Sequence, residues 1–362
     1  MSPTAGVAIS ITLVLIVLGF IYRRSQYVFC AQIVWMTIII GLNTYAVDWK
    51  SNYPIFLLSE SSVSLHQNLY ENLCTVFKHL GFDFIGFNAV ITLVAMCLIV
   101  IRIKASANNP AMMTSLMLIY PFVDFVVQKR FFPAFALVFW ALPKASSSQK
   151  KDRVIFLIVV LLAGWIHSSL WFYLLFAFFW FIPEKIIHKS TFIFFIISVF
   201  SNSFVFWFMQ RVPFVSSNKF KLYFITYAVK SSNIKYMFWI ALHIANFLPI
   251  YFMYHWMKKK KKEDAKVKSI CTQNIIMFFL IPFYSFDPVF MRVFRPLLIT
   301  NYAVIAGGLD KGNKQKMILL LLNIYQVVLC LGTFIIMYIL TTDFNAMVIT
   351  IFENNAFLNI FK

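Results

Sequence analysis

Long uncharged apolar runs recur along the whole chain and constrain its fold more than any other feature. Residues 5–22 and 317–341 contain no charged side chain, and similar runs between them are separated by short basic clusters. About 20 apolar residues cross a bilayer as a helix. Charged residues make up 12% of the 362 residues, against about 25% in a soluble domain. Because a soluble fold of this length could not bury so much apolar surface, the sequence predicts an all-α, polytopic integral membrane protein.

The number of spans follows from the same runs. The first run is not expected to be a signal peptide, because Arg23 and Arg24 follow it instead of preceding it. We expect it to remain as a helix with its N-terminus outside. No internal repeat or soluble domain is visible, so residues 1–362 are expected to form a single integral membrane domain of about 12 transmembrane helices. The candidate spans are 5–22, 28–46, 84–101, 112–128, 131–143, 154–168, 169–183, 191–210, 236–257, 269–286, 289–307 and 317–341.

Basic residues set the predicted orientation. With the N-terminus outside, 20 of the 32 Lys and Arg side chains fall in inner loops, and the cytoplasmic basic loop 258–268 holds five consecutive lysines. The outer side then carries loops 47–83 and 211–235 and the tail 342–362. Residues 64–80 of the first loop predict an outer amphipathic helix. Its expected apolar side consists of Leu65, Leu69, Leu73, Val76, Phe77 and Leu80.

The remaining composition excludes several classes of protein. The net charge of +19 comes from short clusters between apolar runs, a distribution that does not predict a nucleic-acid partner. Five scattered cysteines indicate neither a disulfide framework nor a metal site. The sequence lacks a phosphate-binding glycine loop, a GxSxG elbow, an HExxH motif and paired CxxC motifs. We therefore expect no cofactor and no metal, and we expect any chemistry to occur in or beside the membrane.

Ionisable residues near the ends of spans are the candidate functional residues, because charges are costly inside a membrane. With this topology they all fall on the outer face. Each also has a structural interpretation: a cation can extend from a helix end toward water, a histidine can be a packed core residue, and Asp48 can be a solvated loop acid. His243, deeper in its span, is expected to pack or to bond between helices. The candidates are Asp48, Tyr53, Lys129, Arg130, His167, Arg292 and Arg295.

Four segments around these residues resemble a known family. They are AVDWKSNYPIF (46–56), VVQKRFFPAFALVFWAL (126–142), LLAGWIHSSLWFYLL (161–175) and FMRVFRPLLITNYAVI (290–305). In order and spacing they resemble the EpsG-like branch of bacterial polysaccharide polymerases, Wzy-type enzymes that join lipid-linked repeat units into O-antigen, capsule or exopolysaccharide. The motif positions fall on Asp48 and Tyr53, on Arg130, on His167 with Ser168, and on Arg292 or Arg295. The chain departs from the pattern at Asn43, where the family often has an arginine.

The resemblance implies a glycosyltransferase with a GT-C-like helical fold in the bacterial cytoplasmic (inner) membrane, with its active face outside, toward the periplasm. The enzyme would transfer a glycan from undecaprenyl diphosphate to a hydroxyl of a second lipid-linked oligosaccharide repeat unit. The arginines, with Lys129 and Tyr53, would bind diphosphate and glycan, since a guanidinium holds phosphate oxygens bidentately. His167 or Asp48 would take the acceptor proton. The expected partners are the lipid-linked oligosaccharide and the bilayer, and a chain-length regulator is a further candidate.

Two other classes fit part of the pattern. A flippase or transporter for lipid-linked oligosaccharides would also have many spans, but it should show repeat-related halves and charges at mid-membrane depth. A membrane acyltransferase that modifies surface sugars would use a membrane histidine, but its acyl donor would arrive from the cytoplasm, whereas His167 is expected outside. Both remain alternatives at this point.

The predicted orientation can be tested by labelling single-cysteine variants with an impermeant maleimide. In intact cells Asn218→Cys should react and Lys260→Cys should not, because the lysine run is expected in the cytoplasm. Labelling at position 260 but not at position 218 would reverse the orientation.

Overall fold

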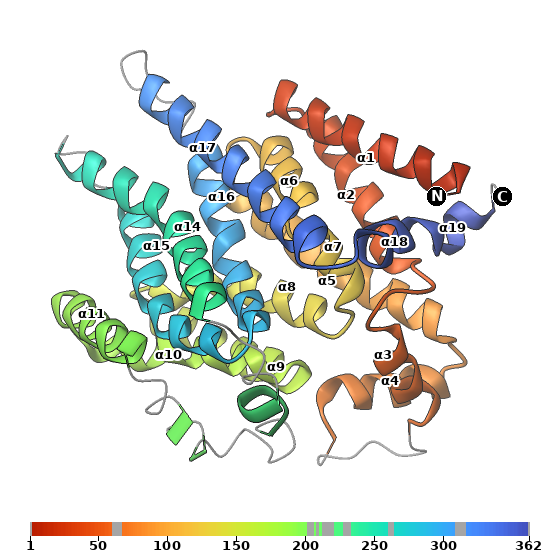
Figure 1. Cartoon of the computed structure of the whole chain (residues 1–362), viewed down its shortest axis with the longest axis horizontal. Helices are drawn as coiled ribbons and strands as arrows, with labels where there is room; N and C mark the ends of the chain where they lie inside the picture. The colour runs from red at the N-terminus through yellow and green to blue at the C-terminus, as the bar shows by residue number, and fades with distance from the viewer. Residues whose placement is uncertain are drawn as a thin grey trace. The chain divides into compact units, whose positions relative to one another are not determined.

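In the computed structural model the regular elements of the described residues are helices (Figure 1). The structure describes residues 2–59, 67–200, 206–207, 210–211, 221–226, 233–259, 264–307 and 316–360. Within these ranges the only β pairing is an isolated bridge between Asn43 and Asn355. The prediction of an all-α protein is therefore confirmed for the described residues.

Six described helical segments are long and apolar enough to cross a membrane, which identifies a multi-pass membrane protein. The larger number of about 12 spans stays a prediction. One expected span, 112–128, is divided into α6 (Pro110–Ile119) and α7 (Phe122–Val127) at Pro121, which lacks the N–H that a continuous helix needs. The six segments are Pro3–Ile21, Phe84–Ser106, Asn233–Lys259, Ala265–Ser285, Val289–Gly307 and Met317–Leu340, and shorter apolar helices cover Gln26–Gly41, Pro110–Ile119, Phe131–Ser146 and Ser168–Phe181.

The chain divides into two compact units. Unit 1 comprises Met1–Ala141, Ile158–His167 and Tyr302–Lys362, and unit 2 comprises Leu142–Leu157 and Ser168–Asn301. Both α9 (Lys150–Ile166) and α16 (Arg295–Gly307) begin in unit 2 and end in unit 1. The expectation of one integral domain is not tested by this division.

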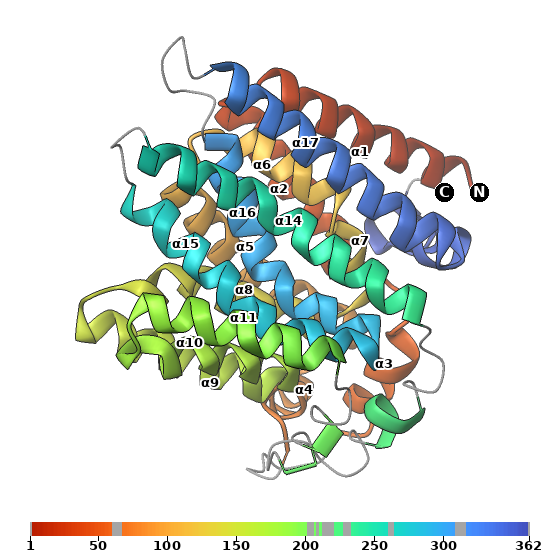
Figure 2. The ribbon, with the colours of Figure 1, turned by 60° about the vertical axis from the view of Figure 1, so that its left-hand side comes forward.

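Unit 1 contains the N-terminal helices and the C-terminal segment. In both views α1, α2, α6 and α17 lie side by side, and the two chain ends are close together (Figures 1 and 2). Besides parts of α9 and α16, its elements are α1 (Pro3–Ile21), α2 (Gln26–Gly41), α3 (Trp49–Leu57), α4 (Leu69–His79), α5 (Phe84–Ser106), α6 (Pro110–Ile119), α7 (Phe122–Val127), α8 (Phe131–Ala141), α17 (Lys316–Phe334), η10 (Ile335–Leu340), η11 (Asn345–Ile349), α18 (Thr350–Glu353) and α19 (Ala356–Asn359).

Unit 2 is built around α14 and α15, which run side by side (Figure 2). Its elements are η1 (Leu142–Ser146), η2 (Ser168–Tyr173), α10 (Leu174–Phe178), η3 (Phe179–Phe181), α11 (Glu184–Phe200), η4 (Lys221–Thr226), α14 (Asn233–Lys259), α15 (Ala265–Ile276), η6 (Met277–Ser285) and η7 (Pro288–Phe294).

Hydrogen bonds define two ends of unit 1. At one end the backbone N–H of Ser2 donates to the Glu353 carboxylate, at 2.9 Å, and Thr44 N–H donates to the Asn354 carbonyl, at 2.8 Å. At the other end Ala111 N–H donates to the Arg23 carbonyl, at 3.2 Å. The first end gathers segments predicted outside and the second gathers segments predicted inside, as alternating spans require. We call the first the predicted outer end.

Side-chain amides satisfy the carbonyl groups that end α2. The last carbonyls of a helix have no partner within it, and in a membrane interior water does not supply one. Asn355, fully buried, donates to the carbonyls of Ile38 and Ile39, and Asn88 donates to the next two. Asn43 donates to three carbonyls, those of Tyr45, Ile351 and Asn354. These bonds hold the C-terminal segment against the end of α2.

The predicted outer amphipathic helix is present but shorter than expected. It begins after a capping box of Asn68 and Glu71 and spans Leu69–His79, while residues 64–66 of the prediction lie outside the described residues. Its buried face holds Tyr70 and Cys74, whereas Val76 and Leu80, predicted on the apolar side, are exposed. The predicted apolar side is therefore not the face that packs against the protein, and its contact with the membrane stays a prediction. Tyr70 determines which face packs inward, because its ring meets Phe87 edge-on at 5.5 Å.

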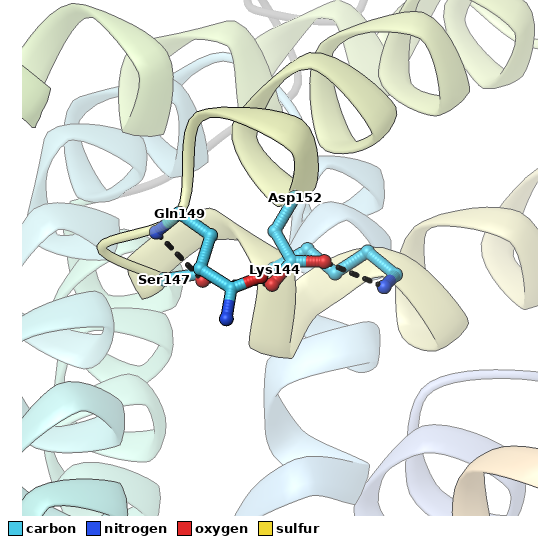
Figure 3. Close-up of polar contacts among 4 residues, drawn as sticks. All are labelled: Lys144, Ser147, Gln149 and Asp152. Atoms are coloured by element: carbon cyan, nitrogen blue, oxygen red, sulfur yellow. Dashed lines mark hydrogen bonds and ion pairs between the residues drawn. The ribbon is translucent and has the colours of Figure 1, made fainter.

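A polar cluster fixes one predicted cytoplasmic loop in unit 2 (Figure 3). Lys144 Nζ lies 3.0 Å from one Asp152 carboxylate oxygen, and Ser147 Oγ donates to the other at 2.8 Å. Gln149 N–H donates to Ser147 Oγ at 3.2 Å. The hydrogen bonds from Ser147 and then from Lys144 hold the pKa of Asp152 below its usual range. The loop before α9 is thus ordered by its own side chains.

We predict that Asn355→Ala destabilises the purified protein by about 1–3 kcal/mol, because it leaves buried carbonyls of α2 without donors. Asn108→Ala is the control, since Asn108 is exposed and makes one long bond of 3.4 Å to Gly307. Thermal unfolding in detergent should show a lower midpoint for the first variant only. Equal midpoints would contradict the role given to Asn355.

We predict a pH-dependent stability contribution from Asp152. Its folded-state pKa is lowered, so the contribution is present above the unfolded-state pKa and is lost as pH falls through the folded-state pKa. Asp152→Asn should therefore unfold at a lower temperature than wild type at pH 7, and the difference should shrink near pH 3. Lys150→Gln, at an exposed neighbour, is the control. A loss of equal size at both pH values would exclude the ionic contribution.

Candidate functional site

The linker between α7 and α8 carries two cationic residues that differ in burial. Lys129 is 3% exposed, and its ammonium donates to the carbonyl of Ile40 at 3.0 Å. Arg130 is half-buried. Lys129 therefore joins the amides that cap α2, whereas the neighbouring Arg130 is only half-buried.

Arg130 lies within electrostatic range of α4. Burial raises the pKa of Tyr70 well above its usual value, and the positive charge of Arg130 acts against that shift. Burial, with Glu71, raises the pKa of Cys74 to about 12, and Arg130 again acts in the opposite direction. The charge of Arg130 thus acts on two groups of the buried face of α4.

His167 ends α9 at the same end of unit 1. Its backbone N–H donates to the Ala163 carbonyl at 2.8 Å, and its half-buried ring meets Phe131 edge-on, with centroids 5.4 Å apart. Phe131 directly follows Arg130. Trp165, two residues earlier, donates its indole N–H to the Gln67 carbonyl just before α4, at 3.1 Å. Arg130 and His167, predicted separately from sequence, are therefore brought into one region with α4.

The short helix α3 presents Asp48 and Tyr53 nearby. Asp48 is half-buried and precedes the helix, and Tyr53 is 37% exposed. Packed rings connect α3 to α4: Phe56 contacts Phe87 at 5.7 Å, and Phe87 contacts Tyr70 at 5.5 Å. Five of the predicted site residues therefore belong to unit 1, close to its predicted outer end.

Arg292 and Arg295 belong to unit 2. Arg292 lies in η7 and is half-buried, whereas Arg295 starts α16 and is 3% exposed. Asp287 accepts from Val289 N–H at 2.8 Å and so caps η7. Burial raises the pKa of Asp287, and Arg292 moves it in the opposite direction. Arg292 is thus the more accessible of the two arginines, with a carboxylate beside it.

A buried histidine on α14 packs against the segment that carries these arginines. His243 is fully buried, and its Nδ1 lies 2.7 Å from the Tyr284 hydroxyl. The Phe294 ring packs against its imidazole at 4.3 Å. The expectation that His243 makes an interhelical contact is therefore confirmed, and we assign it to the core.

Two residues of the candidate site, Tyr70 and Trp165, were not predicted from the sequence. Tyr70 and Cys74 are four residues apart and therefore share a helix face. This face can be predicted from the sequence once the capping box has placed the start of the helix. The contact of Trp165 with Gln67 has no signal in the sequence, because it depends on how α9 packs in three dimensions.

The described residues define a multi-pass helical membrane protein with a cation, a histidine and aromatic side chains at one end of unit 1. The sequence profile of the EpsG family matches residues 26–349. The chain therefore belongs to the EpsG family, which confirms the resemblance noted in its motifs. A search of the curated proteins found no match, and a search of solved structures found none either.

Proposed function

We propose that the protein is a polysaccharide polymerase. It transfers a glycan from undecaprenyl diphosphate to a lipid-linked oligosaccharide repeat unit on the outer face of the bacterial cytoplasmic membrane. Membership of the EpsG family is consistent with polysaccharide polymerisation in general. The observation that best supports the finer statement is the contact of the His167 ring with Phe131, the residue that directly follows Arg130.

The leaving group of the proposed reaction is a lipid diphosphate, which requires cations near the membrane surface. Arg130 suits this role because it is half-buried and because its fork binds phosphate oxygens bidentately. It would also stabilise the charge that develops as the glycosidic bond breaks. Lys129 is engaged with the Ile40 carbonyl, so we propose that it positions the linker and that Arg130 contacts the ligand.

A general base would remove the proton from the acceptor hydroxyl, and His167 is the first candidate. Imidazole titrates near neutral pH, and the ring is half-buried at the end of α9. Asp48 is the second candidate. We further propose that Arg292 and Arg295 contact phosphate within unit 2, that the fold is GT-C-like with about 12 spans, and that the active face is periplasmic.

The proposal predicts the behaviour of arginine variants in cells. Arg130→Ala, and either Arg292→Ala or Arg295→Ala, should abolish polymer while the protein still inserts. Loss of one charge-assisted phosphate contact costs about 1.5–3 kcal/mol, or roughly ten- to a hundredfold in rate. Substitution of these arginines by lysine should restore polymer only in part, because an ammonium group does not bind phosphate bidentately. Glycan gels measure the outcome.

Arg211→Ala is the matched control, because Arg211 is an exposed arginine that donates to the Trp207 carbonyl. It should leave polymer unchanged. Full-length glycan from all of the alanine variants at positions 130, 292 and 295 would reduce these arginines to helix-end anchors.

The assignment of His167 as general base predicts how activity depends on pH. With purified enzyme and lipid-linked repeat units, activity should fall as pH drops through the imidazole pKa, since only the neutral ring accepts a proton. An aspartate base would keep its activity to lower pH. Wild type, His167→Gln and Asp48→Asn should be compared. Near-normal turnover by His167→Gln, with the fall in activity at low pH unchanged, would exclude His167 as the general base. Asp48 would then be the base, or the reaction would need none.

A further inference from the structure

Helix α3 carries a pair of stacked aromatic rings, which can present a flat ring face. The rings of Trp49 and Tyr53 have centroids 5.5 Å apart and planes within 22° of each other. Phe84, which is 3% exposed, contacts both: its ring lies 4.7 Å from Trp49 at 78° and 5.7 Å from Tyr53 at 60°. One buried ring therefore supports two nearly parallel rings.

Both rings of the pair are partly accessible. Tyr53 is 37% exposed and Trp49 is half-buried. The indole N–H groups of Trp35, Trp165 and Trp180 each donate to a protein oxygen. The Trp49 indole N–H has no protein acceptor within the described part of the chain. It remains available to water or to a ligand oxygen.

We propose that Trp49 and Tyr53 form a stacking platform for a pyranose ring of the glycan substrate. This inference rests on the proposed function and names the part of the substrate that α3 contacts. A pyranose with mostly equatorial hydroxyls presents a flat C–H face that matches an aromatic surface, and its rim oxygens accept hydrogen bonds. The Trp49 N–H supplies a donor at the edge of the platform.

The platform separates two tasks within unit 1. Arg130 contacts the charged diphosphate, whereas α3 contacts an uncharged sugar and selects those with a flat C–H face. The competing explanation is an interfacial anchor, because Trp and Tyr gather at membrane surfaces. An anchor requires apolar bulk, whereas a platform requires a flat ring, so substitutions at Trp49 distinguish them.

The test measures binding of the oligosaccharide repeat unit, freed of lipid and diphosphate, to purified protein in nanodiscs by calorimetry. Trp49→Ala and Trp49→Leu should both raise the Kd by roughly fivefold or more, and Trp49→Phe should raise it less. Tyr27→Ala is the control, because Tyr27 is 90% exposed and lies at the opposite end of unit 1. Unfolding midpoints confirm that each variant is folded.

Wild-type affinity in Trp49→Leu, or no measurable binding by the wild type, would overturn the platform. Failure of the proposed function would look different. A wild type that binds the free oligosaccharide through Trp49 but joins no lipid-linked repeat units would retain the platform and reject the polymerase. Arg130→Ala should keep oligosaccharide binding while losing polymer, since it contacts the diphosphate only.

Discussion

The carbonyl groups that end α2 are the constraint on which unit 1 depends. In an apolar surrounding each unpaired carbonyl costs free energy, and a helix cannot satisfy its own last turn. Here the donors come from three distant segments: Asn88 on α5, Lys129 before α8 and Asn355 near the C-terminus. Satisfying one helix end therefore fixes α2, α5, the α7–α8 linker and the C-terminal segment together.

The hydrogen bonds at the end of α2 also position the residues of the candidate site. Lys129 is held at the Ile40 carbonyl, which anchors the linker just before Arg130 and Phe131. The charge of Arg130 acts on Cys74 of α4, and the Phe131 ring meets His167. A buried lysine with a structural contact thus positions the arginine that follows it. Asn43, which stands where the family often has an arginine, donates instead to three backbone carbonyls, so at this position the chain uses an amide for a structural task.

Sequence predicted the long helices well, because an uncharged run of bilayer length has one favourable structure. The span predicted at 236–257 is α14, Asn233–Lys259, and the positions of Arg130 and His167 at helix ends were also predicted. The sequence did not predict which face of α4 is buried, because leucine spacing does not reveal that Tyr70 packs on Phe87. The contact between Phe131 and His167 was beyond sequence reasoning as well, because it depends on tertiary packing of α8 and α9.

The most direct test of the central claim is the stoichiometry of the reaction catalysed by the reconstituted wild-type protein. Purified protein in nanodiscs, given only lipid-linked repeat units, should lengthen the glycan and release one undecaprenyl diphosphate for each bond formed. A diphosphate-to-bond ratio near one, without added nucleotide or acyl donor, is the predicted result. No chain growth, together with passage of labelled lipid-linked oligosaccharide across a vesicle membrane, would contradict the account and identify a transporter.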